Sequence, residues 1–258
     1  MRAHLASFLL AAFVLGSAQG GDSITLRLKP KKGTTYVFET VQETAAQGAA
    51  GPKNVSTNSM KVLQSDGKTI KLQSTIDKIE SKQPGVEALK GMKTVMTLTP
   101  LYKFVSITSA GGGAAGKAAA QNVEMAMKMT PSFPQQAIRP GYSWSMPVDF
   151  KAMMSKMSAG AIVVEGPGII TFKVTFARLD RKAGKATAVL KINAKSTLNV
   201  TAQGQKLKID FDFAGENVVD VASGMATSTS ATVKQGMSGT RGSGTMTSKS
   251  TTRLLSMK

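Results

Sequence analysis

The stretch IITFKVTFARLDRKAGKATAVLKINAKSTLNVTA, residues 169–202, decides the fold class. Apolar side chains alternate with polar ones on both sides of its DRKAGK segment, as with Phe172 and Val174 before it and Leu190 and Ile192 after it. A period of two residues is typical of a half-buried β-strand, and Asp and Gly between two such runs favour a turn. The stretch therefore predicts two long antiparallel strands with one apolar face and one polar face.

The same alternation recurs toward both ends of the chain. Further runs with this period are SITLRLK (23–29), TTYVFETVQET (34–44), NSMKVLQSDGKTIKLQSTIDKIE (58–80), LYKFVSIT (101–108), KLKIDFDF (206–213) and ENVVDVASGMATSTSATVKQG (216–236). The third of them has Asp66 and Gly67 at its centre, which predicts a hairpin. The sequence thus predicts an all-β, mainly antiparallel fold, built as a long-strand meander or a half-open barrel.

The middle of the chain differs from both halves. GGGAAG (111–116) is expected to be a flexible joint, KAAAQNVEMAMKM (117–129) has a helix-forming composition, and DFKAMMSKM (149–157) predicts a second short helix. We therefore divide the chain into an N-terminal strand half (19–110), a Gly-rich joint with a Met-rich helical segment (111–160), and a C-terminal strand half (161–258). The two strand halves are expected to form one domain.

The first residues have the pattern of a secretory signal peptide. Arg2 precedes the apolar run LASFLLAAFVLG (5–16), and small residues follow, with the best cleavage position after Ala18. The run is too short for a comfortable membrane span, which needs roughly 20 apolar residues. We expect residues 1–18 to be removed and the mature protein to be periplasmic or extracellular.

If residues 1–18 are removed, the mature chain has none of the residues on which many kinds of catalytic site depend. His4 is the only histidine, and the chain has no cysteine. Zinc sites built on Cys or His, Cys nucleophiles and Ser-His-Asp triads are then excluded. Enzymes that use only carboxylates or a Ser-Lys pair are not excluded. The acidic residues, however, fall in turns or on the polar faces of strands, so we predict no catalytic site and no cofactor.

Methionine is concentrated in the middle segment. Of the chain's 15 methionines, seven lie there: Met125, Met127, Met129, Met146, Met153, Met154 and Met157. Thioethers line adaptable apolar pockets and fill irregular core gaps, and in an exported protein they also bind Cu(I). With Trp144, which is equally a candidate core anchor, these residues are our candidate ligand pocket.

The alternative is a copper site made of Met125, Met127 and Met129. It needs an extended segment or a loop, because a helix would place Met125 and Met129 on one face and Met127 elsewhere.

The charge balance points to an anionic partner. The formal net charge is +18, and Lys173, Lys191, Lys195, Lys206 and Lys208 fall on the polar faces of predicted strands. Anionic envelope surfaces are the polyanions that an exported protein meets, although a basic solvated face also keeps a protein soluble. Aromatic residues make up only 5% of the chain, so we expect no specific nucleic-acid binding. Aromatic girdles are not visible in the sequence either, so we expect that the protein is not an integral membrane protein.

Two motifs carry a resemblance to known proteins. The stretches FPQQAIRPGYSWSMP (133–147) and FAGENVVDVASGMATSTSATV (213–233) resemble a broad group of uncharacterised exported bacterial β proteins, although Tyr142 stands where those proteins often have Asp. The architecture is also loosely similar to periplasmic lipoprotein-carrier folds, in which a half-open barrel holds acyl chains. The resemblance implies an envelope protein without assigned activity.

Taken together, these patterns predict a non-catalytic exported protein. It would bind an apolar or amphipathic, lipid-like ligand between a curved sheet and the Met-rich segment. A periplasmic Cu(I)-binding protein and a structural or interaction protein without a small ligand are the alternatives.

Overall fold

The computed structural model describes residues 22–81, 86–110, 113–158, 160–239 and 242–258. The predicted signal peptide lies outside these residues. Within them, twelve strands are present: β1 (Thr35–Ala46), β2 (Ala49–Ser65), β3 (Ile70–Glu80), β4 (Lys93–Leu98), β5 (Phe104–Ala110), β6 (Ser143–Asp149), β7 (Ile162–Val164), β8 (Ile169–Lys182), β9 (Lys185–Ala202), β10 (Gln205–Asp220), β11 (Ala226–Gly239) and β12 (Gly242–Met257). The helices are a short 3₁₀ turn (Val86–Leu89), α1 (Gly113–Lys128) and α2 (Phe150–Met157). The predicted all-β fold with two short helices in the middle segment is confirmed.

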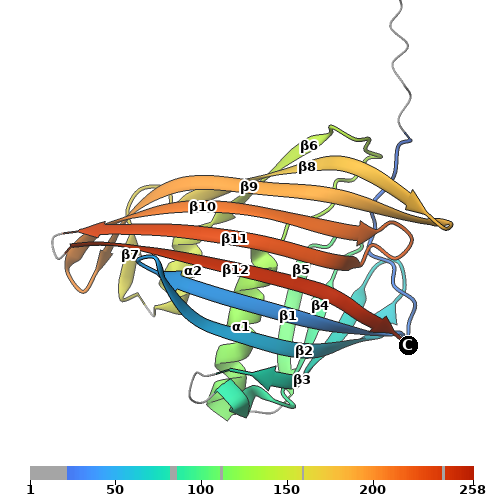
Figure 1. Cartoon of the computed structure of the whole chain (residues 1–258), viewed down its shortest axis with the longest axis horizontal. Coiled ribbons are helices and arrows are strands. Elements are labelled where there is room, and N and C mark those ends of the chain that lie inside the picture. Colours follow the sequence, from blue (N-terminus) through green and yellow to red (C-terminus); the bar gives the residue numbers. More distant parts are fainter. Residues whose placement is uncertain (1–21, 82–85, 111–112, 159, 240–241) are drawn as a thin grey trace, which may run out of the picture.

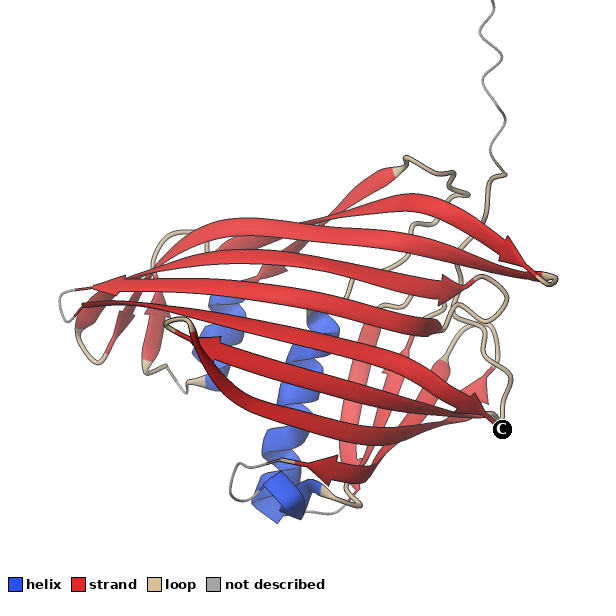
Figure 2. Cartoon of the chain, in the orientation of Figure 1, coloured by secondary structure: helices blue, strands red, loops and turns tan. Residues whose placement is uncertain are grey.

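The strands form one curved, open antiparallel sheet. Its order is β5-β4-β3-β2-β1-β12-β11-β10-β9-β8-β6, and β7 pairs with the far end of β9. Pairing of β1 with β12 joins the N-terminal and C-terminal strands within this sheet. Figures 1 and 2 show β8–β12, β1 and β2 as a front layer, with α1 and α2 behind it on the concave side.

The core on the concave side is divided into two clusters. The first packs beneath β6, β8, β9 and β10 and includes Phe172, Phe176 and Ile192, while the second packs beneath β1 to β4 and includes Val62 and Leu72. Helix α1 contributes to both. Met125, with Met129 just beyond the helix end, packs against the first cluster, whereas Val123 and Met127 pack against the second. The helix therefore fills the space between the two halves of the curved sheet.

One predicted strand, residues 23–29, is not a strand. Its alternation correctly marks burial, since Leu26 and Leu28 are fully buried, one in each cluster. Only a single bridge, Ile24 with Ile138, pairs it like a strand. The amides of Leu28 and Lys29 instead donate to Pro100 O and Ser223 O, at 2.7 and 2.8 Å. The segment crosses the end of the sheet, where separate loops supply the acceptors that a neighbouring strand would have supplied.

Other boundaries also differ from expectation. The helix begins at Gly113, so most of the predicted flexible joint is helical, and residues 111–112 lie outside the described part. The strand expected from Leu101 begins only at Phe104, because Tyr102 lies in a turn with φ of 62°. The hairpin at Asp66 is confirmed: the Asp66 carboxylate accepts hydrogen bonds from the amides of Lys68 and Thr69. The domain boundaries predicted above remain predictions.

Gly224 fixes the crossing segment against the sheet, and we expect its substitution to be costly. A Cβ at Gly224 (φ +70°) would collide with the carbonyl of Arg27. Gly184→Ala is the matched control, since Gly184 has φ of +76° and open space around it. The control should lose about 1 kcal/mol of unfolding free energy from backbone strain alone, and Gly224→Ala about 3 kcal/mol or more. Urea denaturation measures both, and equal losses would contradict the proposed packing role.

Candidate ligand-binding cavity

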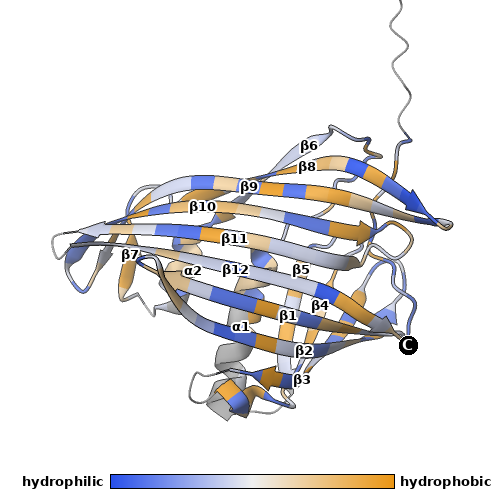
Figure 3. Ribbon diagram, in the orientation of Figure 1, coloured by the Kyte–Doolittle hydropathy of each residue, from blue (hydrophilic) through white to orange (hydrophobic). Residues whose placement is uncertain are grey.

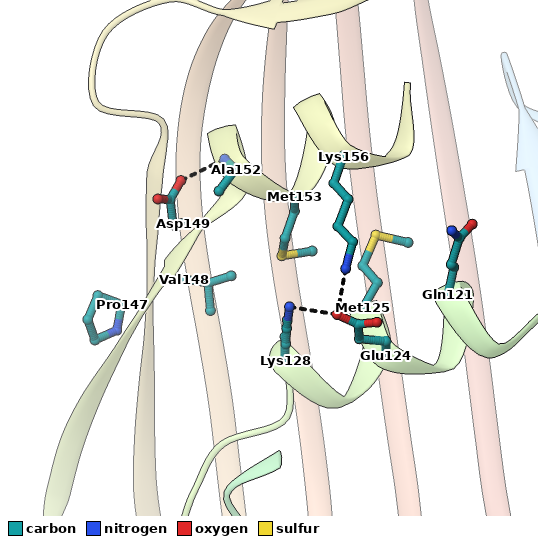
Figure 4. Close-up of a pocket in the computed structure, with 10 residues that line it drawn as sticks. All are labelled: Gln121, Glu124, Met125, Lys128, Pro147, Val148, Asp149, Ala152, Met153 and Lys156. Atoms are coloured by element: carbon teal, nitrogen blue, oxygen red, sulfur yellow. Dashed lines mark hydrogen bonds and ion pairs between the residues drawn. The ribbon is translucent and has the colours of Figure 1, made fainter. Parts of the chain in front are cut away.

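A cavity of about 370 Å³ lies between α1, α2 and β6. Its lining comes from these three elements alone (Figure 4): Gln121, Glu124, Met125, Lys128, Pro147, Val148, Asp149, Ala152, Met153 and Lys156. This volume lies within the range of small-molecule sites, roughly 300–1,000 Å³.

Helical spacing brings the α1 residues to the cavity. Gln121, Glu124, Met125 and Lys128 stand at positions i, i+3, i+4 and i+7, which share one face of a helix. Ala126, at an intervening position, is exposed. One helix face thus supplies both an apolar and a charged part of the lining.

Helix α2 forms one wall of the cavity, and a helix cap fixes where this helix begins. The Asp149 carboxylate accepts a hydrogen bond of 2.8 Å from the Ala152 amide, which satisfies one of the unpaired donors at the helix start. From this start, Met153 and Lys156 are brought to the cavity. Because β6 ends at Asp149, the same residue ends the strand and begins the helix.

The inner part of the cavity is apolar. Val148 and Met153 are buried and Met125 is half-buried, and all three belong to the first core cluster or pack against it. Methionine side chains adapt their shape at low cost, so this wall can accommodate a flexible chain.

The rim of the cavity carries an ion-pair cluster. Oε1 of Glu124 accepts hydrogen bonds from Nζ of Lys128 at 2.8 Å and from Nζ of Lys156 at 3.0 Å (Figure 4). These hydrogen bonds, from Lys128 first and then Lys156, lower the pKa of Glu124 below its ordinary value of 4.5. Since Lys156 belongs to α2, the cluster also links the two helices.

The structure brings together only part of the predicted pocket. Met125 and Met153 line the cavity. Four residues pack against the same cluster but are not among the lining residues: Met129, Trp144, Met146 and Met154. Trp144 acts as a core anchor, because its indole N–H donates to Ser132 O at 3.0 Å. Met127 belongs to the other cluster, and Met157 is the last residue of α2.

The predicted copper site lacks the geometry it needs. Met125 and Met127 are both helical and pack against different core clusters, so Met125, Met127 and Met129 do not share one side. The extended or loop arrangement that a three-thioether ligand set needs is not the one described for Met125 and Met127. Among the described residues, no group of three or more His, Cys, Asp or Glu could hold a metal ion.

The predicted basic face is a mixed-charge face. Lys173, Lys191, Lys195, Lys206 and Lys208 are all exposed. Acidic residues of β10 interrupt them, however: Lys195 pairs with Asp212 at 3.2 Å and Lys208 with Asp210 at 3.6 Å. Lys191 stands opposite Glu216 in the β9–β10 register. The polar face that carries these lysines is therefore mixed in charge, and its contact with an anionic surface stays a prediction.

A polar strip separates the two core clusters on the concave face. Val233 packs against the first cluster and Leu254 against the second. Between them, the register places these residues on the same face: Thr229, Ala231, Ser248, Ser250, Thr252 and Thr40. Thr40 and Thr252 share a hydrogen bond of 2.9 Å between their hydroxyls. The pale colour of β11 and β12 in Figure 3 reflects this weakly polar composition.

Sequence reasoning missed most of the cavity rim. Gln121, Glu124 and Lys128 could have been found, since they share a helix face with Met125. Pro147, Val148 and Lys156 could not, because their contact with α1 depends on the placement of β6 and α2 under the sheet.

No family model matches the sequence, and no curated protein matches it. Similar solved structures include one on lipid–protein interactions in lipovitellin, with a TM-score of 0.42 and 9% identity over 88% of this chain. This chain spans only 26% of that lipovitellin chain. A DUF1329 family protein from Desulfovibrio piger is also similar, with a TM-score of 0.27 and 8% identity over 87% of each chain.

A LolA superfamily protein from Nitrosomonas europaea has a TM-score of 0.21 and 9% identity over 89% of this chain and 87% of its own. A DUF1329 family protein and a LolA superfamily protein thus both occur among the similar structures. At these TM-scores the likeness carries no argument about function. In the part of the chain that the structure describes, none of the helices is long and apolar enough to span a bilayer.

The lowered pKa of Glu124 predicts a pH-dependent contribution to stability. The ion-pair cluster should stabilise the fold fully above the ordinary pKa of 4.5, and this stabilisation should be lost as the pH falls through the lower folded value. Its size should be at most about 1 kcal/mol, because the lysines are largely exposed. Thermal unfolding of the wild type and Glu124→Gln at pH 7 and pH 3 tests this. The difference between them should be smaller at pH 3 than at pH 7, and a difference that grows on acidification would contradict it.

Proposed function

We propose that this protein is an exported, non-catalytic binding protein for a lipid-like amphipathic molecule, held in the cavity between α1, α2 and β6. The observation that carries the proposal is the combination of an apolar inner wall, made by Met125, Val148 and Met153, with a charged rim at Glu124 and Lys156. Such a division matches a molecule with one apolar and one polar end.

The groups at the cavity are poorly suited to catalysis. Glu124 is held by two lysines, and its lowered pKa keeps it ionised at neutral pH, so it is a weak general acid. Asp149 is engaged in capping α2. The ten lining residues include no Ser, Thr or Tyr that could act as a nucleophile. These features support a binding role.

Export is the part of the proposal that rests on the sequence. The signal-peptide pattern at residues 1–18 supports it.

Contact of Lys173 or Lys206 with an anionic envelope surface stays a prediction. Intact mass measurement of the protein recovered from the periplasm would show cleavage after Ala18, and an uncleaved chain would contradict export by this route.

Filling the cavity should weaken ligand binding strongly. Ala152 is exposed, yet it lines the cavity, so Ala152→Trp would place a bulky ring there with little disturbance of the core. The matched control is Ser155→Trp, an exposed position on the same helix that does not line the cavity. We expect Ala152→Trp to weaken binding of a fluorescent fatty acid by at least about tenfold, which is ~1.4 kcal/mol, and the control to leave it within about twofold.

Native mass spectrometry of protein purified without detergent provides the complementary test. A co-purified, organic-soluble mass that is present with the wild type and the Ser155→Trp control but absent with Ala152→Trp supports the proposal. Equal binding of the fluorescent fatty acid by both variants would reject this cavity as the site.

A further inference from the structure

The three charged residues on the rim do not balance one another. Glu124 supplies one negative charge against the two ammonium groups of Lys128 and Lys156. Each ammonium has three N–H donors, and the described hydrogen bonds use one donor of each. Both lysines are substantially exposed, with 44% and 62% of their side chains accessible. Two cationic groups with unused donors therefore stand at one edge of the cavity.

The remaining carboxylate of the lining does not cancel this excess. Asp149 directs its carboxylate to the Ala152 amide at the start of α2, apart from the lysine pair in Figure 4. The positive charge is thus localised on the side where α1 and α2 face each other across the cavity.

The apolar wall lies next to these cationic groups. Met125 neighbours Glu124 on α1, and Met153 is one helical turn before Lys156 on α2. An apolar chain that packs against the two thioethers would leave its polar end at the ammonium groups. Hydrogen bonds between an ammonium and an anionic oxygen are about twice as strong as those between neutral groups. A cationic head would meet two like charges, and a neutral alcohol would gain no ionic interaction.

We propose that the cavity binds amphiphiles with an anionic headgroup, a carboxylate or a phosphate, held between the ammonium groups of Lys128 and Lys156. This rests on the proposed function and adds the charge of the headgroup to it. The anion joins Glu124 in bridging the two helices, because one ammonium belongs to α1 and the other to α2. A fatty acid and a phospholipid present the same chemistry to this pair, so both are included in the test.

The test compares four probes that share one alkyl chain: dodecanoate, dodecyl phosphate, dodecanol and dodecyltrimethylammonium. Each is titrated against the wild-type protein by displacement of a neutral fluorescent alkyl probe, below its critical micelle concentration and at physiological salt. We expect one or both anionic probes to bind at least about tenfold more tightly than dodecanol, and the ammonium probe to bind most weakly. The relative affinity of dodecanoate and dodecyl phosphate separates a fatty acid from a phosphorylated lipid.

Two variants test whether the preference for anionic headgroups depends on Lys128 and Lys156. Lys128→Met combined with Lys156→Met keeps the apolar stems and should remove the preference for anions while dodecanol binding stays within about threefold. Lys151→Met is the matched control, because Lys151 is an exposed lysine on α2 that is not among the lining residues. It should leave the preference unchanged, which separates the lysine pair from the general positive charge of the protein.

The outcomes for the two proposals are distinct. Equal affinities for anionic and neutral probes in the wild type would overturn the headgroup assignment and leave the binding role intact. A preference for anionic probes that survives in the Lys128→Met, Lys156→Met double variant would also overturn the headgroup assignment and leave the binding role intact. Failure of every probe to bind the wild type would overturn both proposals. The wild-type comparison decides the headgroup even if the double variant does not fold.

Discussion

The structure depends on how an open, curved sheet covers its concave face. A sheet of this curvature has apolar side chains on its inner side, and burying them is the main stabilising contribution available to the fold. Because the sheet ends at β5 and β6, its own strands do not cover that face. Helix α1 does so by contributing residues to both core clusters, and α2 covers the region beside β7 and β8. The short helices are thus the second layer on which the sheet depends.

The cavity follows from the same arrangement. Two short helices that each pack on the sheet need not pack closely on each other, and their described link is a hydrogen-bonded ion pair at the rim, Glu124 with Lys156. An amphipathic helix that packs on a sheet places its apolar residues near the sheet and its charged residues near solvent. In this protein the cavity between α1 and α2 exposes both the apolar wall and the charged rim to another molecule.

Much of the fold could be predicted from the sequence, but less of the site. Alternation along residues 169–202 identified β8 and β9, and the helical spacing separated Met127 from Met125. Alternation records burial, however, and not the identity of a hydrogen-bonding partner, so residues 23–29 were assigned to a strand that does not exist. The ion pair of Lys195 with Asp212 depends on strand register, and the ion pair of Lys156 with Glu124 depends on tertiary placement. Neither is encoded in the local pattern of one segment.

The hydroxyl-bearing strip on β11, β12 and β1 has a consequence for the interior as a whole. Serine and threonine side chains hydrogen-bond to water about as well as to one another, so covering them gains little free energy. The strip therefore exerts little attraction on α1, in contrast to the apolar clusters on either side. Covering the strip thus adds little to the stability of the fold, whereas covering the two apolar clusters beside it adds much more.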